Sequence, residues 1–320
     1  FIYESGRLVQ SPKSMLGFRL EPRQRGYITS IVARILKHIR EQASRQLGQP
    51  VTQATLGRPV KFRSSMGADG GEQAIKILTE AAMEAGFERI DFLPEPSAAA
   101  VGYHARSTRL HQALIVDIGG GTTDIALAEV GGQSSYPHIL ETWGEPKGGT
   151  DVDLGLSLRA VMPLFGSGLC SDLLAPVFVD AASVSDLNRQ KNFRDRQFTR
   201  TAQPYADRLI QLQKPGMTVR LNRDVERLKI ELSQRENSEC QLDYIEPRLV
   251  AQATQEKLQQ GAGSFMRSFW ELLQQVSAGI QDERPMLFLT GGMSRAPYVV
   301  AAVKQVFPHC QVAPADASLG

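Results

Sequence analysis

The sequence contains few cysteines. Three occur in 320 residues, at Cys170, Cys240 and Cys310, and no two of them form a Cys-x-x-Cys pair. An odd number of widely spaced cysteines argues against both a disulfide framework and a structural zinc site. We therefore expect a protein of a reducing compartment, for which the cytoplasm is the simplest location.

An excess of one charge and long apolar runs are also lacking. The chain has 36 Lys and Arg against 34 Asp and Glu, a formal net charge of +2; this implies no strong field for nucleic acid or an acidic membrane surface. No apolar run reaches the ~18 residues of a membrane span, and no signal peptide is evident. We expect neither a nucleic-acid nor a membrane partner. Because the chain begins with Phe1 rather than Met, we also expect a fragment of a longer protein.

The residues that are present fit a globular α/β protein. Hydrophobic residues make up 42% and charged residues 22% of a chain that is long enough for two domains. After a short extended lead over 1–17, apolar spacing predicts helices over 27–47 and 72–85, and strands over 51–60 and 90–93. This alternation of helix and strand indicates α/β layering.

The most informative stretch is an apolar strand that runs into three glycines and out into a second strand, over 114–127. Short β-branched runs around Gly119, Gly120 and Gly121 predict a tight hairpin whose bare backbone can approach a ligand closely. Successive N–H groups in such a turn form a concave, partly positive nest that suits polyphosphate oxygens. An ordinary glycine-rich turn is the alternative interpretation.

Polar residues bracket these glycines. Thr122 and Thr123 add hydroxyl donors for phosphate. Asp117 and Asp124 cannot bind phosphate themselves, because carboxylates repel it, but they are suited to anchor the hydration shell of a nucleotide-bound Mg²⁺ ion. A plain turn does not require this set of side chains, so the set favours a phosphate site.

A second glycine pair, Gly148 and Gly149, precedes Thr-Asp-Val-Asp at a predicted helix start. Backbone N–H groups and the helix dipole attract anions at such a position. Capping of the helix by Thr150 or Asp151 is the alternative.

A third glycine pair, Gly291 and Gly292, lies between a strand predicted over 286–289 and a helix predicted over 297–307. A strand, a double glycine and then a helix form the geometry of a nucleotide-binding turn, although a single Gly-Gly is a weak signal.

Two charged residues lie outside the glycine motifs but near predicted element ends. Glu95 follows the strand over 90–93, at the strand end where open α/β sheets place their ligands, although Pro96 also fits an ordinary helix start. Lys13 lies in a turn, where a lysine is usually a solvated surface charge.

A helix predicted over 219–233 carries Glu226 and Lys229, three residues apart. Without a ligand, this spacing predicts an exposed salt bridge that contributes a few tenths of a kcal/mol.

Together, these motifs resemble those of the DnaK-type heat-shock chaperone ATPases of the actin-like ATPase superfamily, and they occur in the order found in that family. The resemblance implies an α/β, two-lobed ribonuclease H-like fold with a nucleotide cleft between the lobes. It implies ATP or ADP and Mg²⁺ as cofactors, and slow Mg-dependent ATP hydrolysis that drives lobe closure.

The resemblance also implies catalytic roles. Lys13 would reach the γ-phosphate, and Glu95 would orient water near the Mg²⁺ ion, which Asp117 and Asp124 would hold through water. The predicted catalytic set is Lys13, Glu95, Asp117 and Thr122.

Nucleotide contacts are implied as well. Glu226 and Lys229 would bind the ribose hydroxyls and Ser233 the base edge, while Ile230 stands where the family has an arginine that stacks on adenine. The phosphate residues are Gly119, Gly120, Gly121, Thr122, Thr123, Gly148 and Gly149. The second adenosine motif is Gly291, Gly292, Met293 and Arg295.

The resemblance predicts lobe I over 1–110 and lobe II over 111–320, with an expanded insert at about 160–213. The first phosphate hairpin of lobe I, Asp-x-Gly-Thr-x-Asn, and the final return helix are missing from the sequence. Within the family, the chain looks most like the YegD-type chaperone-like proteins, which lack a peptide-binding domain.

Other functions remain open at this point. A sugar or acid kinase would use Asp117 as a general base toward a substrate hydroxyl. A filament-forming actin-like protein or a nucleotide-sensing module would bind ATP, the latter without hydrolysing it. A chaperone would also bind a client or partner protein.

Overall fold

The computed structural model describes residues 11–280 and 284–313, so the first ten residues of the lead predicted over 1–17 lie outside it. The chain divides into two compact units. Unit 1 comprises Gly149–Arg267 together with residues 1–11, and unit 2 comprises Pro12–Gly148 together with Ser268–Gly320. Within the described ranges, no helix has the length and apolar character needed to cross a bilayer.

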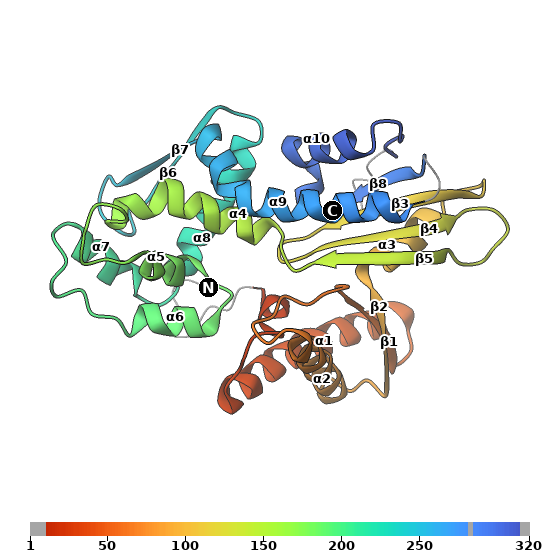
Figure 1. Cartoon of the computed structure of the whole chain (residues 1–320). Helices are drawn as coiled ribbons and strands as arrows, with labels where there is room; N and C mark the ends of the chain where they lie inside the picture. Colours follow the sequence, from red (N-terminus) through yellow and green to blue (C-terminus); the bar gives the residue numbers. More distant parts are fainter. Residues whose placement is uncertain (1–10, 281–283, 314–320) are drawn as a thin grey trace. The chain divides into compact units, whose positions relative to one another are not determined.

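The core of unit 2 is a mixed four-stranded sheet in the order β5-β4-β3-β8 (Figure 1). β3 (His111–Ile118) and β4 (Thr123–Val130) form an antiparallel hairpin, and β5 (His138–Glu145) pairs antiparallel with β4. β8 (Met286–Thr290) runs parallel to β3. The α/β class predicted from the sequence is confirmed.

One face of this sheet is covered by α3 (Glu95–His104). Ala100 of α3 packs into a cluster with Ile115 of β3 and Phe288 of β8, all three nearly inaccessible to solvent. The run of alanines in α3 allows this close approach, because a methyl group keeps the helix near the sheet. The packing of α3 on the sheet therefore fixes the position of Glu95, the first residue of α3.

A second layer of unit 2 is built from β1 (Gln53–Arg58) and β2 (Arg89–Pro94), which are parallel, with α1 (Pro22–Leu47) and α2 (Ala68–Glu84). α1 begins before its predicted start because Glu21 and Gln24 form a capping box, in which the Glu21 N–H donates to Gln24 Oε1 at 2.9 Å. Phe87 joins a small buried cluster between these elements. β2 leads directly into α3 and so into Glu95.

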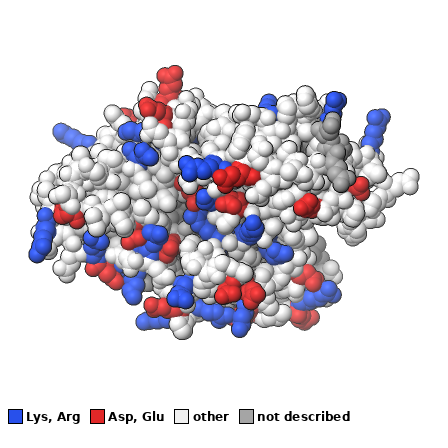
Figure 2. Space-filling view, in the orientation of Figure 1, with Lys and Arg blue, Asp and Glu red and all other residues white. Residues whose placement is uncertain are grey.

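The remaining elements of unit 2 follow β8. A short 3-10 helix, Gly292–Arg295, precedes α10 (Pro297–Val306). Near the N-terminus, Lys13 lies in another 3-10 helix, Pro12–Met15. On the face of the molecule shown in Figure 2, basic and acidic side chains are intermingled, as the near-zero net charge predicts.

Unit 1 is mainly helical. Its helices are α4 (Gly149–Leu156), a π-helical turn (Ser157–Val161), a 3-10 turn (Met162–Phe165), α5 (Ala175–Ala182), α6 (Leu187–Arg194), α7 (Tyr205–Leu212), α8 (Met217–Leu232) and the first half of α9 (Gln255–Gly279). β6 (Asn237–Gln241) and β7 (Val250–Thr254) form an antiparallel pair. The segment 160–213, for which the sequence predicts no elements, folds around buried Phe165, Phe178 and Phe193.

Within unit 1, α4 and α9 approach so closely that backbone meets backbone. A Cβ atom on Gly155 would lie 2.0 Å from the Gly261 carbonyl oxygen. We expect Gly155→Ala to lower the free energy of unfolding by at least about 2 kcal/mol, because neither backbone can retreat without moving its helix. Gly263→Ala is the control, since no atom lies within 4 Å of its Cβ position. Urea unfolding should show it unchanged or up to about 1 kcal/mol more stable; equal losses in both variants would contradict the close approach.

The two compact units do not divide the chain where the predicted lobes do. The chain passes between the units after Gly148 and after Arg267, whereas the lobe boundary was predicted between Leu110 and His111. Segment 12–110 belongs to the same unit as the four-stranded sheet, because α3 packs on β3 and β4. The division into lobes stays a prediction.

Candidate functional site

The hairpin between β3 and β4 turns through Gly119–Thr122, and the Gly119 N–H donates to the Thr122 carbonyl at 3.0 Å. None of its three glycines has a positive φ, so the turn does not need glycine for its dihedral angles. At Gly121 a side chain has little room, because a Cβ atom would lie 3.1 Å from Ser14 Oγ. The bare backbone therefore lets the Ser14 side chain approach, and the approach of a ligand stays a prediction.

The two other glycine corners of unit 2 meet this hairpin. A Cβ atom on Gly148 would lie 2.5 Å from the Gly119 carbonyl oxygen, and one on Gly291 would lie 2.4 Å from the Ile118 carbonyl oxygen. Gly291 also has a φ of +82°, a conformation that favours glycine. Three glycine corners that are far apart in the sequence thus converge at one end of β3.

Thr123 fixes one of these corners. Its side chain is fully buried, and its hydroxyl donates to the Lys147 carbonyl at 2.9 Å. The Lys147 Nζ in turn donates to Ser268 Oγ at 2.7 Å. Thr123 therefore holds the segment before Gly148 against the hairpin and does not present its hydroxyl to a ligand.

Asp117 and Asp124 face each other across the β3–β4 register. Burial raises the pKa of each carboxyl to about 6. Asp124 is almost inaccessible to solvent, and its Oδ1 accepts a hydrogen bond from the Val60 N–H at 2.6 Å. The Thr122 side chain also bonds Asp124 and, like Val60, lowers its pKa. Asp124 is thus held by protein donors, whereas Asp117 is only partly buried.

The pH dependence of stability follows from these shifts. Because the pKa of Asp124 rises on folding, the native state binds this proton more tightly, and stability falls as the pH rises from about 4 to about 6. Asp124→Asn keeps one amide oxygen as acceptor for the Val60 N–H and removes the charge. We expect this variant to lose less stability than the wild type over that range in urea unfolding without Mg²⁺; an unchanged pH slope would contradict the assignment.

Lys13 and Glu95 form an ion pair in unit 2. The Lys13 side chain is 46% exposed and that of Glu95 26%. Their charges also reach Asp117: Glu95 raises its pKa and Lys13 lowers it, both less strongly than burial raises it. Lys13 thus stays exposed, as a solvated surface charge would be, but it is paired with Glu95, and three residues of the predicted catalytic set lie close together.

The segment after β8 differs slightly from the predicted strand, double glycine and helix. The 3-10 helix Gly292–Arg295 lies between Gly291 and α10, and the Ser294 hydroxyl donates to the Gly291 carbonyl at 2.7 Å. Met293 is buried and Arg295 is exposed. This short turn fixes the positive-φ conformation of Gly291.

The predicted nucleoside residues Glu226, Lys229 and Ser233 lie along α8 and at its end, in unit 1. The exposed salt bridge between Glu226 and Lys229 is wrong, because Lys229 is only 6% exposed and its Nζ lies 2.8 Å from Asp153 Oδ1 of α4. The helix α4 packs on α8 and brings this partner within reach. Ile230 is exposed.

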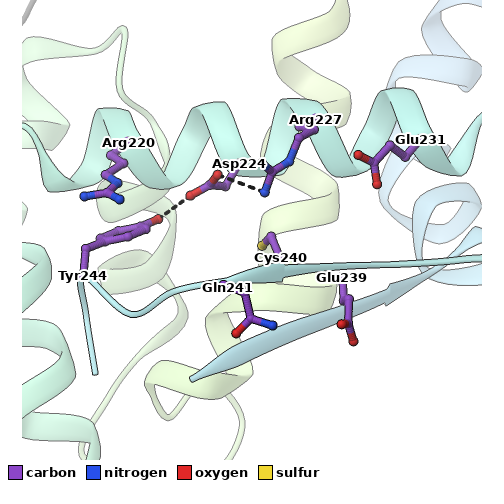
Figure 3. A pocket seen from close by; sticks show the side chains of 8 residues that line it. All are labelled: Arg220, Asp224, Arg227, Glu231, Glu239, Cys240, Gln241 and Tyr244. Atoms are coloured by element: carbon purple, nitrogen blue, oxygen red, sulfur yellow. Dashed lines mark hydrogen bonds and ion pairs between the residues drawn. The ribbon is translucent and has the colours of Figure 1, made fainter. Parts of the chain in front are cut away.

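A separate groove of about 450 Å³ in unit 1 lies between α8 and β6 (Figure 3). Its side chains pair with one another: Tyr244 donates to Asp224 at 2.7 Å, Arg227 lies 3.2 Å from Asp224, and Arg220 stacks on the Tyr244 ring at 3.9 Å. Because no predicted site residue lines the groove, it is not part of the candidate site.

Across residues 11–280 and 284–313, no three His, Cys, Asp or Glu side chains are grouped as ligands for one metal ion. The partly buried carboxylate of Asp117 suits a hydrated Mg²⁺ ion, which would take its other ligands from water and phosphate.

Sequence reasoning missed three contacts at predicted site residues: in unit 2 the Val60 amide and Lys147, and in unit 1 the pairing of Asp153 with Lys229. Asp153 lies in the Gly-Gly-Thr-Asp-Val-Asp motif, so its type and position were a signal for its importance. A backbone amide such as that of Val60 leaves no signal in the sequence.

Glycine corners that meet beside carboxylates at a strand end are typical of α/β proteins that bind phosphate-bearing ligands. Comparison with known proteins agrees with this class. Residues 9–159 match the family model described as Hsp70 protein. The chain is similar to the Hsp70 family and to its DnaK-type chaperones.

Individual relatives show how much of the family is represented. The chain is 36% identical to the chaperone protein dnaK of Cyanophora paradoxa over 38% of its own length and 18% of the relative. It is 28% identical to the chaperone protein dnaK3 of a Synechocystis strain over 86% of its own length and 30% of the relative. The chaperone protein DnaK of Elusimicrobium minutum is 35% identical over 37% of this chain. The chain thus spans less than a third of the length of these relatives.

Proposed function

We propose that this chain binds Mg·ATP and hydrolyses it slowly, as part of the ATPase domain of a DnaK-type chaperone. The observation that carries the proposal is the convergence of Gly119, Gly148 and Gly291 at the end of β3, beside Asp117. Similarity to the Hsp70 family supports ATP as the ligand. No specific feature of the described residues favours a sugar kinase or a filament.

In this proposal, the hairpin Gly119–Thr122 and the Gly148 and Gly291 corners form the wall for the phosphates. Backbone N–H groups there meet anionic oxygens with no side chain between them. Thr122 and Thr123 act mainly inside the protein, because Thr122 bonds Asp124 and Thr123 bonds Lys147. Gly149 would contribute its amide at the first turn of α4.

The chemical step is assigned to Lys13, Glu95 and Asp117. The Lys13 ammonium would neutralise charge on the γ-phosphoryl group, and Glu95 would orient the attacking water. Asp117 would hold the water shell of Mg²⁺, and buried Asp124 would keep the hairpin in shape through Val60. Bound Mg²⁺ supplies charge neutralisation at the phosphates.

The adenosine end is assigned to Glu226, Lys229 and Ser233 of α8 and to the segment Gly291–Arg295. Exposed Ile230 would give the adenine an apolar contact in place of a stacked arginine. We further propose that hydrolysis is coupled to closure of two actin-like lobes, 1–110 and 111–320, around the nucleotide.

Two finer assignments complete the proposal. The protein acts in the cytoplasm on a client or partner protein, and it belongs to the YegD-type branch. Client binding is proposed for the whole protein, because the chain covers only 18–30% of the curated relatives.

Calorimetric titration with ADP and ATP, with and without Mg²⁺, tests the proposal. We expect Mg-dependent binding, followed by release of inorganic phosphate from ATP at a slow, steady rate. A folded protein that binds neither nucleotide would overturn the proposal. Binding without phosphate release would overturn the catalytic part and favour a nucleotide sensor.

A further inference from the structure

An ion pair is buried inside unit 1. The Lys229 Nζ of α8 lies 2.8 Å from Asp153 Oδ1 of α4, and the two side chains are 8% and 3% exposed. Charges removed from water are tolerated only when they are well paired. Each of these residues therefore determines where the other one lies.

Several other negative groups surround the Asp153–Lys229 pair. Asp151 and Glu226 both raise the pKa of Asp153, burial raises it most, and Lys229 is the group that lowers it. The Lys229 Nζ also lies 3.5 Å from the carbonyl oxygen of Gly149, the first residue of α4. The Lys229 ammonium therefore contacts two negative groups at the start of α4, the Asp153 carboxylate and the Gly149 carbonyl oxygen.

We propose that Asp153 is a positioning residue for the nucleoside end of the site: it fixes the Lys229 ammonium between α4 and α8, where it meets the ribose hydroxyls. This role rests on the proposed function. A lysine side chain has four rotatable bonds and many conformations. Pairing with Asp153 removes most of them, so the ammonium is pre-organised before the nucleotide binds.

The same pair also contacts the start of α4. Gly149 belongs to the second glycine pair, and its carbonyl is near the ammonium that Asp153 holds. A change at Asp153 therefore acts on Lys229 first and on the start of α4 second. Packing alone would not distinguish between ligands with and without a ribose hydroxyl, and this difference provides the test.

The experiment compares ADP with 2′-deoxy-ADP by calorimetric titration of the full chain. The variants are Asp153→Asn, Asp153→Glu, Lys229→Gln and the double variant Asp153→Asn/Lys229→Gln. Glu239→Gln is the control, because it removes an exposed carboxylate of β6 in the same unit. The double variant removes both charges, so no unpaired charge stays buried. It therefore tests the role of the pair even if an unpaired lysine unfolds the Asp153→Asn variant.

We expect Asp153→Asn to weaken ADP binding by about tenfold and to reduce the preference for ADP over 2′-deoxy-ADP. Lys229→Gln should do the same, the double variant should be no worse than either single variant, and Asp153→Glu should restore part of the preference. Glu239→Gln should match the wild type.

Other outcomes overturn the proposal. Losses that are equal for the two nucleotides, or that add in the double variant, would show that Asp153 acts through packing and not through Lys229. If the folded wild type binds neither nucleotide, the proposed function fails and this role fails with it. Binding by the wild type with an unchanged Asp153→Asn variant rejects only the role of Asp153.

Discussion

Gly291→Ala is expected to abolish measurable ADP binding. Gly291 has a φ of +82°, and an added Cβ atom would lie 2.4 Å from the Ile118 carbonyl oxygen and 2.6 Å from Asp117 Oδ1. The backbone strain alone costs about 1–3 kcal/mol, and the collision displaces the end of β3 together with Asp117. We expect at least a ~100-fold loss of affinity in calorimetric titration, equivalent to about 2.7 kcal/mol.

A glycine outside the predicted site provides the matched control. Gly26 of α1 has no atom within 4 Å of its Cβ position and no positive φ, and it belongs to the same unit but to no predicted site. Gly26→Ala should therefore bind ADP within about threefold of the wild type. If Gly291→Ala and Gly26→Ala bound alike, the corner formed by Gly291 would not be part of the site. Urea unfolding of each variant separates a local loss of binding from global unfolding.

The parts of the fold that could be predicted are those with local causes. The β3–β4 hairpin follows from two apolar runs around three glycines, and α8 and α10 follow from their apolar spacing and from Pro297. Glu95 was predicted as a site residue because strand ends in α/β sheets hold ligands, and its role stays a prediction. In each case a few neighbouring residues determine the outcome, so the pattern is visible in the sequence.

The parts that could not be predicted depend on contacts between distant segments. Lys229 looks like half of a surface salt bridge until α4 packs on α8 and brings Asp153 to it. Asp124 looks like a free carboxylate until Val60, 64 residues earlier, donates to it. The insert over 160–213 has no clear periodicity, because its short helices bury single phenylalanines.

The convergence of the glycine corners and the raised pKa values of the acidic residues have the same cause, which is close packing at the end of β3. The same packing that brings Gly148 and Gly291 to the end of β3 also removes water from Asp117 and Asp124, and this loss of water raises the pKa of both carboxyls to about 6. A dry, crowded corner is where backbone N–H groups and a bound cation act most strongly on an anion. Close packing and perturbed acidity therefore mark the same place.

Variants of the predicted catalytic residues should lower the rate of ATP hydrolysis more than they lower nucleotide affinity. We expect Lys13→Met, Glu95→Gln and Asp117→Asn each to lower the rate of ATP hydrolysis by about 100-fold or more, because Lys13 and Glu95 would act on the transferring phosphoryl group and the attacking water, and Asp117 would hold the Mg²⁺ shell beside them. ADP affinity should change by less than about threefold in Lys13→Met and Glu95→Gln, whose side chains form a partly exposed ion pair. Single-turnover phosphate release measures the rate, and calorimetry measures the affinity.

The chain offers a matched control for these variants. Arg89 and Asp91 of β2 form an ion pair at 3.2 Å whose side chains are 65% and 58% exposed. Arg89→Met and Asp91→Asn make the same chemical changes as Lys13→Met and Asp117→Asn, in the same unit but on the surface. They should hydrolyse ATP at the wild-type rate. If Lys13→Met and Glu95→Gln did so too, the pair would be a surface contact and the chemical step would have to be assigned to other residues.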